Sequence, residues 1–279
     1  MKIALLSDIH GNYVAFEECL KYIDNNNFDG VIFLGDYITD CPYPQKTIHL
    51  VKQTMKKYKT WCIHGNHEDA MLNHKNNPDE WKYNSQTGDL LNTYNDLTDD
   101  DLLFFKNMPI SQTIYLTNCK PFVICHGSPN NVRESLIESE GNSNDWLEII
   151  ETDYLFCGHT HKPFVYEYNG KKLINCGSVG MPMNNQTNTQ FTQIAFADSE
   201  WKIRLISLPY NIGALLQDFE TSGIYEKYHW WAKLLAKCLQ TGIMYPHIAL
   251  KRALEISNNC NETLNEKHWK QAANELGVE

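Results

Sequence analysis

Five short apolar runs lie in the first 160 residues, and each ends next to a glycine and a side chain that can bind metal. The runs span residues 3–6, 31–34, 61–63, 122–125 and 154–157. Uninterrupted apolar runs of this length are typical of strands buried on both faces. The polar residues that follow these predicted strands are Asp8, His10, Asp36, Asn66, His67, His126, His159 and His161.

Helical periodicity separates the first three runs. Asn12 can cap a helix that has Phe16 and Ile23 on its apolar face. Residues 47–55 show the same spacing of apolar positions. Alternating strands and helices indicate a parallel sheet, whose functional groups gather at the carboxyl ends of the strands. We therefore expect the metal-binding side chains to lie at one edge of the sheet.

The pattern changes after residue 160. Residues 166–175 are typical of a hairpin that turns at Asn169-Gly170, and residues 190–197 and 202–208 predict further strands. These segments predict a second, more antiparallel sheet. From residue 212 onward the apolar spacing is helical, and Trp230-Trp231 is interpreted as helix packing.

These patterns divide the chain into two parts. We predict a domain of residues 1–208 and a C-terminal helical extension, residues 209–279, packed on the core. The extension could instead cover the site or form a homo-oligomer contact. A polar, partly helical insertion at residues 69–108 is expected to overhang the site, where loops commonly set specificity.

Composition narrows the class of partner. The formal net charge is −10, and arginine occurs only at positions 133, 204 and 252. Duplex nucleic acid and anionic membranes both require dense positive charge, so neither is expected as a partner. The nine cysteines show no C-x-x-C pair, and no apolar stretch approaches the roughly 18 residues of a spanning helix. With no leader pattern at the N-terminus, we expect a cytoplasmic protein with free thiols.

The prediction of a metal site depends on several side chains of metal-binding types lying close together. Asp8 and His10 are two positions apart, so an extended chain directs them to the same side. Carboxylate, imidazole and amide ligands together suit manganese, iron, zinc or nickel. A single histidine or aspartate at a strand end is ordinarily a cap or a surface group, so only the joint pattern indicates a site. The histidines interpreted as lying outside the site, mostly on the surface, are His49, His64, His74, His229, His247 and His268.

Five motifs occur in order: D-x-H at Asp8, G-D at Gly35, G-N-H-E at Gly65, H-G at His126 and G-H-x-H at Gly158. This series resembles the calcineurin-like metallophosphoesterase superfamily. Pro42 and Pro44, the run His126 to Pro129, and Cys176 to Gly180 resemble its small bacterial and archaeal phosphoesterase branch. The resemblance covers residues 1–208. It implies an α/β fold, a four-layer α/β/β/α sandwich of two mixed sheets with helices outside and a metal pair at one end.

The resemblance also implies the roles of individual residues. One divalent metal is expected on Asp8, His10, Asp36 and His161, and the other on Asp36, Asn66, His126 and His159. The nucleophile is expected to be hydroxide held between the two metals, with His67 as the general acid that protonates the leaving alkoxide. Most relatives carry Asp where this chain has Glu68, which is expected to orient His67. Asn12 is expected to cap a helix and could touch bound phosphate.

The substrate class follows from a missing residue. Relatives that act on phosphoproteins carry an arginine soon after the G-D motif, and this chain has Tyr37 to Cys41 there. The planar guanidinium group of arginine binds a phosphate dianion well through two hydrogen bonds. Because this arginine is missing and a diester monoanion needs less positive charge, we expect a small phosphodiester substrate. Lys162 or Arg133 could substitute, which leaves phosphomonoesterase or protein phosphatase activity as an alternative. A non-catalytic metal-binding scaffold is a further alternative, which the presence of His67 disfavours.

Overall fold

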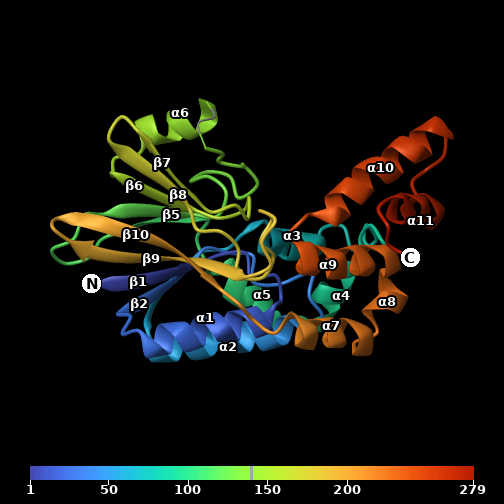
Figure 1. Cartoon of the computed structure of the whole chain (residues 1–279), viewed down its shortest axis with the longest axis horizontal. Helices are drawn as coiled ribbons and strands as arrows, with labels where there is room; N and C mark the ends of the chain where they lie inside the picture. The colour runs from blue at the N-terminus through green and yellow to red at the C-terminus, as the bar shows by residue number, and fades with distance from the viewer. Residues whose placement is uncertain (139–140) are drawn as a thin grey trace.

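The computed structural model describes residues 1–138 and 141–279, and its core is a pair of five-stranded sheets (Figure 1). In spatial order, the first sheet contains β10 (Glu200–Leu208), β9 (Thr189–Ala197), β1 (Lys2–Leu6), β2 (Gly30–Phe33) and β3 (Lys59–Cys62). The second contains β4 (Ser111–Ile114), β5 (Phe122–Cys125), β6 (Tyr154–Cys157), β8 (Lys171–Asn175) and β7 (Phe164–Tyr168).

Both sheets are mixed. β1, β2 and β3 are parallel, as are β5, β6 and β8, whereas β9 pairs antiparallel with β1 and with β10. The prediction that the strands after residue 160 form a sheet of their own is wrong. The hairpin β7–β8 extends the second sheet beside β6, and β9 and β10 extend the first beside β1. Pairing between such distant segments depends on tertiary contacts that local patterning does not contain.

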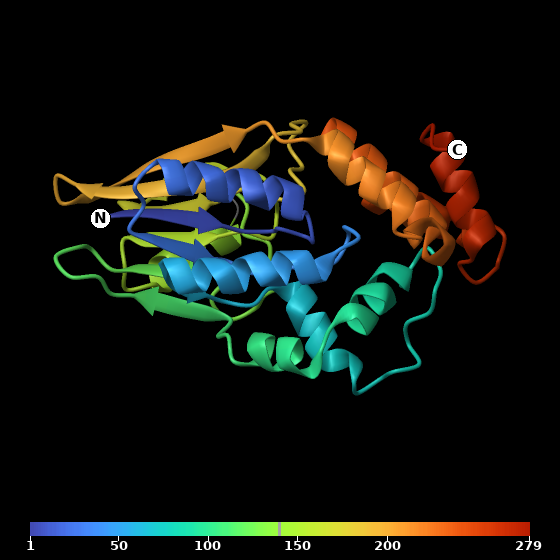
Figure 2. The ribbon, with the colours of Figure 1, turned by 90° about the horizontal axis from the view of Figure 1, so that it is seen from below.

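The layered arrangement arises because alternate residues of each strand point to opposite faces of its sheet. Ile3 and Leu5 of β1 lie in the core between the sheets, and Ala4 and Leu6 point the other way, toward Phe16. Helices α1 (Tyr13–Asn25) and α2 (Pro44–Lys57) cover that outer face (Figure 2). Helix α6 (Gly141–Ile149) lies on the outer face of the second sheet (Figure 1). The predicted four-layer sandwich is confirmed.

The remaining helices gather at the carboxyl ends of the strands, at the right of Figure 1. The insertion supplies α4 (Gly88–Asp96), α5 (Asp99–Lys106) and most of α3 (Asn66–His74). The C-terminal segment forms α7 (Ile212–Thr221), α8 (Ile224–Lys227), α9 (His229–Thr241), α10 (Tyr245–Asn259) and α11 (Glu266–Glu275). An apolar cluster joins Leu235 of α9 to Cys41 and Met181, which lie in loops at the strand ends. Within the described residues, none of these helices is long and apolar enough to cross a membrane.

Two histidines interpreted as surface residues are buried. His74 stacks on Trp81 with ring centroids 3.9 Å apart. His268 lies in the α11 N-terminal turn, where its Nδ1 accepts a hydrogen bond from the backbone N–H of Asn265. The surface prediction is wrong for both because helices at this end of the molecule pack against one another. All nine cysteines are free, as expected.

Candidate metal centre and active site

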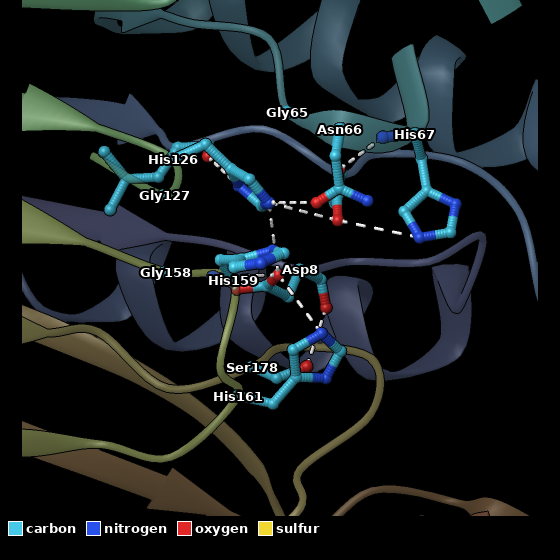
Figure 3. A network of polar contacts seen from close by, with 12 residues as sticks. Asp8, Gly65, Asn66, His67, His126, Gly127, Gly158, His159, His161 and Ser178 are labelled. Atoms are coloured by element: carbon cyan, nitrogen blue, oxygen red, sulfur yellow. Dashed lines mark hydrogen bonds and ion pairs between the residues drawn. The ribbon is translucent and has the colours of Figure 1, made fainter. Parts of the chain in front are cut away.

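Five loops at the carboxyl ends of β1, β2, β3, β5 and β6 bring the candidate ligands into one cluster (Figure 3). The loops are tied together by backbone hydrogen bonds. Asp8 N–H donates to the Gly35 carbonyl at 3.1 Å, and Gly158 N–H donates to the His126 carbonyl at 2.9 Å. The second bond follows from β5 and β6 lying side by side in parallel. The geometry of the sheets therefore sets the positions of the ligands.

One group of ligand atoms comes from Asp8, His10 and His161. His161 Nε2 lies 3.2 Å from Asp8 Oδ1 and 3.1 Å from His10 Nε2. All three side chains are buried. Three unlinked ligand atoms at such separations can be spanned by one cation.

A second group comes from Asp36, His126 and His159. His126 Nε2 lies 3.2 Å from Asp36 Oδ2 and 3.0 Å from Asn66 Oδ1. Asp36 Oδ2 is also 3.8 Å from His10 Nε2, so this carboxylate lies between the two groups. The structure thus brings together all seven residues to which the family resemblance assigns a ligand role, and Asp36 lies between the two groups.

The imidazoles are oriented by contacts at their other nitrogen. His126 Nδ1 lies 2.7 Å from the Leu34 carbonyl, and His161 Nδ1 lies 2.6 Å from the Met181 carbonyl. A ring nitrogen next to a carbonyl oxygen must carry the proton, which leaves Nε2 as the ligand atom. Both Nε2 atoms face the centre of the cluster, as Figure 3 shows.

His10 is oriented by a residue that the sequence reasoning missed. The Asp40 carboxylate lies 2.8 Å from His10 Nδ1 and is buried. Carboxylate–histidine pairs of this kind fix the tautomer of a metal ligand and raise its basicity. The sequence feature that could have indicated this role is the position of Asp40, an acidic residue in the same loop as Asp36.

Strained backbone is concentrated at these residues. Five of the ligand candidates have a left-handed φ between 49° and 65°: Asp8, His10, Asp36, His159 and His161. Such conformations are costly for residues other than glycine and persist at functional sites because the surrounding structure imposes them. Gly158 permits the close approach, since a Cβ there would lie 1.9 Å from Ser7 Oγ and 2.6 Å from Asp8 Oδ2.

Electrostatics make the cluster receptive to a cation. Burial acts to raise the pKa of Asp8, but His161 and His126 outweigh it and lower that pKa to about 2. Burial acts to lower the pKa of His126, but Asp36 and Asp8 outweigh it and raise that pKa to about 9. Burial and the His126 charge lower the pKa of His159 to about 4. The carboxylates are therefore ionised and attract positive charge at this point.

His67 lies at the edge of the cluster with a partly exposed side chain (Figure 3). Its backbone N–H donates to Asp36 Oδ1 at 2.9 Å, and its Nδ1 lies 2.8 Å from the Thr39 hydroxyl. Its Nε2 is 3.9 Å from Asp36 Oδ2. Distance alone also groups His67 with His10 and Asp36 as a possible third set of ligands. Burial lowers the pKa of His67.

Glu68 has a role other than the expected one, whereas the prediction that Asn12 caps a helix is confirmed. The Glu68 carboxylate is buried and accepts backbone N–H bonds from Asp36, Tyr37 and Gly65, each 2.8 Å long, and the contact to His67 Nδ1 is made by Thr39 instead. Asn12 is fully buried, and its Nδ2 donates to the Gly180 carbonyl while its Oδ1 caps α1. It does not line the cavity among the described residues, so it is not placed to touch phosphate.

A cavity of about 550 Å³ opens over the cluster. Its walls include Lys162, while Arg133 instead donates to the Asn66 carbonyl at 3.3 Å and pairs with Asp69 at 3.2 Å. The cavity also contains residues that the sequence did not indicate, which are Phe164, Met183, Trp231, Met244 and His247. The last three come from the C-terminal segment, so that segment forms part of the site wall.

Comparisons with known proteins agree with this geometry. The sequence model described as calcineurin-like phosphoesterase matches residues 1–163. The uncharacterized protein MJ0912 of Methanocaldococcus jannaschii is 24% identical over 229 residues, which cover 75% of this chain and 88% of the relative.

Solved structures show the same fold over most of the chain. The hypothetical protein PH1004 of Pyrococcus horikoshii superposes with a TM-score of 0.74 at 17% identity, covering 86% of this chain and 98% of that one. A metallophosphoesterase from Sphaerobacter thermophilus gives a TM-score of 0.68 at 21% identity, covering 87% and 100%. At these identities the likeness concerns the fold alone.

Proposed function

Because the chain belongs to the calcineurin-like phosphoesterase family, we propose that it is a metal-dependent phosphodiesterase with His67 as its general acid. The observation that carries the proposal is the convergence of Asp8, His10, Asp36, His126 and His161, in which each ligand atom lies 3.1 to 3.9 Å from at least two others. The free thiols fit a reducing compartment such as the cytoplasm.

The donor set fits two divalent cations. One set is Asp8, His10, Asp36 and His161, and the other is Asp36, Asn66, His126 and His159. Mixed nitrogen and oxygen donors favour manganese, iron, zinc or nickel over calcium or magnesium. When bound, such a pair supplies an activated water and neutralises charge on the phosphate oxygens.

The protein residues supply the proton. The Thr39 hydroxyl contacts both the Ile38 carbonyl and His67 Nδ1, and in this proposal its oxygen accepts from His67 Nδ1–H. In the imidazolium form of His67, Nε2 carries the second proton and is the atom that gives it to the departing oxygen. The distance of 3.9 Å between His67 Nε2 and Asp36 Oδ2, at the edge of the ligand cluster, supports this role.

Charge on the cavity wall favours a diester over a monoester. Among the described lining residues, Lys162 is the only lysine or arginine, and Asp40 and Glu138 oppose it. A monoester dianion needs more positive charge around its free oxygens than a diester monoanion does. The same wall disfavours a phosphoprotein as substrate.

The test compares a diester and a monoester that share a leaving group. Manganese-loaded protein is assayed with bis(p-nitrophenyl) phosphate and with p-nitrophenyl phosphate, and a higher kcat/KM is expected for the diester. A higher value for the monoester would establish a phosphomonoesterase instead. Inactivity on both, with two ions bound per chain, would favour a metal-binding scaffold.

A further inference from the structure

Trp231 and His247 occupy a distinctive place next to the proposed acid. His67, Trp231 and His247 line the main cavity of about 550 Å³, and the same three line a smaller neighbouring cavity of about 170 Å³. The smaller cavity also has Ser85, Gln86 and Leu90 in its wall, from the insertion. Residues from two separate parts of the chain therefore enclose the space beside His67.

Resting on the proposed function, we propose that Trp231 and His247 form the subsite for the leaving group, and that this group carries a flat aromatic ring. The acid must lie next to the departing oxygen, so whatever is bonded to that oxygen extends into the space beside His67. That space is bounded by the Trp231 indole and the His247 imidazole.

The Trp231 ring is held in place before any ligand arrives. Its Nε1 donates to Asp40 Oδ1 at 3.4 Å, and its ring packs edge-on against Trp269 with centroids 5.9 Å apart. The Asp40 carboxylate is the one that orients His10. A fixed aromatic surface loses little entropy on binding, which makes it an effective stacking platform.

The surroundings select an uncharged ring. Trp231 and His247 are tilted by 52° with centroids 6.4 Å apart, so the two rings do not stack on each other, and both residues line the two cavities. Phe164 and Met244 add apolar surface to the main cavity. Asp40 and Glu138 disfavour a leaving group that carries further phosphates. A nucleoside meets these requirements in size and chemistry, as does a simple aryl alcohol.

The test measures selectivity rather than activity alone. Methyl diesters with phenyl, trifluoroethyl or 3′-adenosyl leaving groups are compared in wild type, Trp231→Ala and Trp231→Phe, all loaded with manganese. Trp231→Ala is expected to lower the ratio of kcat/KM for ring-bearing over trifluoroethyl esters by roughly 10- to 100-fold, the range for one lost stacking contact. Trp231→Phe is expected to retain most of the ratio. A larger loss for adenosyl than for phenyl identifies a nucleoside.

A second measurement does not depend on turnover. Adenosine binding to the metal-loaded protein is followed by calorimetry and is expected to weaken by the same factor in Trp231→Ala. Trp230→Phe, on the same helix but outside both cavities, is the control and is expected to change neither quantity. A ratio and an adenosine affinity that both stay within about twofold in folded Trp231→Ala would overturn the subsite. Hydrolysis of none of the esters by wild type would overturn the proposed function, while adenosine binding would still test the subsite.

Discussion

Glu68 Oε2 accepts a hydrogen bond from the backbone N–H of Asp36 at 2.8 Å, so a side chain from the first turn of α3 holds the backbone of the loop that follows β2. The same carboxylate accepts from Gly65 and Tyr37. Burial, together with the Asp36 charge, raises the pKa of Glu68 to about 7. The position of Asp36 between the two ligand groups therefore depends on the Glu68 carboxylate.

Replacing Glu68 by glutamine tests this support. The amide of Glu68→Gln presents N–H groups to backbone N–H groups, so at least one buried donor loses its acceptor. We expect a loss of about 1–3 kcal/mol in the free energy of unfolding, measured by urea denaturation. Asp69→Asn is the neighbouring control, and its partly exposed pair with Arg133 is expected to contribute less than about 1 kcal/mol. Equal losses in the two variants would contradict the support role.

Asp36 lies between the two ligand groups, so its replacement is expected to affect both metals. Asp36→Asn is expected to lower metal content from two ions per chain to fewer than one, measured by elemental analysis after dialysis. The increase in Tm on adding manganese should shrink in parallel, because ligand binding stabilises only the state that binds it. Asp24→Asn, at a surface pair with Lys57, should keep both properties. Loss of a single ion would rule out the bridge.

His67 is expected to donate a proton to the leaving group and not to bind a metal ion. His67→Asn should lower kcat by about 10²- to 10⁴-fold for a diester with an alkoxide leaving group. The loss should be smaller for p-nitrophenolate, which leaves without a proton. Metal content should not change, and a fall in metal content would instead identify His67 as a ligand of the third possible set.

Asp101 is expected to make the folding stability of the protein depend on pH in the acid range. Burial acts to raise its pKa, but Lys52, Gln45 and Thr98 outweigh this and lower the pKa to about 2 from 3.8. A folded pKa below the unfolded one means that the stabilisation is present above pH 4 and is lost as the pH falls from about 4 to about 2. The stability difference between wild type and Asp101→Asn, from urea midpoints, should therefore shrink in that window. Asp99→Asn, with a side chain 95% exposed, is the control and should change the urea midpoint little.

The sequence was sufficient for features that are encoded locally. The apolar run before Asp8 predicts a buried strand, and Asn12 predicts a helix N-cap, because both depend on neighbouring residues alone. The family resemblance added the order of the motifs and so the ligand set that the structure brings together. The resemblance also supplied the four-layer sandwich, which the structure confirms.

Tertiary contacts account for what the sequence did not predict. The β9 strand pairs with β1 across most of the chain, Lys2 lying opposite Ala195. Trp231 was interpreted as helix packing, and it does pack on Trp269, but it also reaches Asp40. Glu68 was expected beside His67 because of its position in the motif, and its longer side chain reaches three backbone donors instead. No local pattern specifies which of several partners within reach a side chain will choose.

The candidate ligands and part of the cavity wall come from separate segments of the chain, which has a consequence for how substrate selectivity can change among related proteins. The candidate ligands and the acid all lie between residues 8 and 161, inside the segment shared with the family, whereas Trp231, Met244 and His247 belong to a later segment. Exchanging the C-terminal helical segment between relatives would change the cavity wall, and so the preferred ester, without changing the candidate ligands or His67. Chimeric proteins joined near residue 210 offer a direct route to altered selectivity.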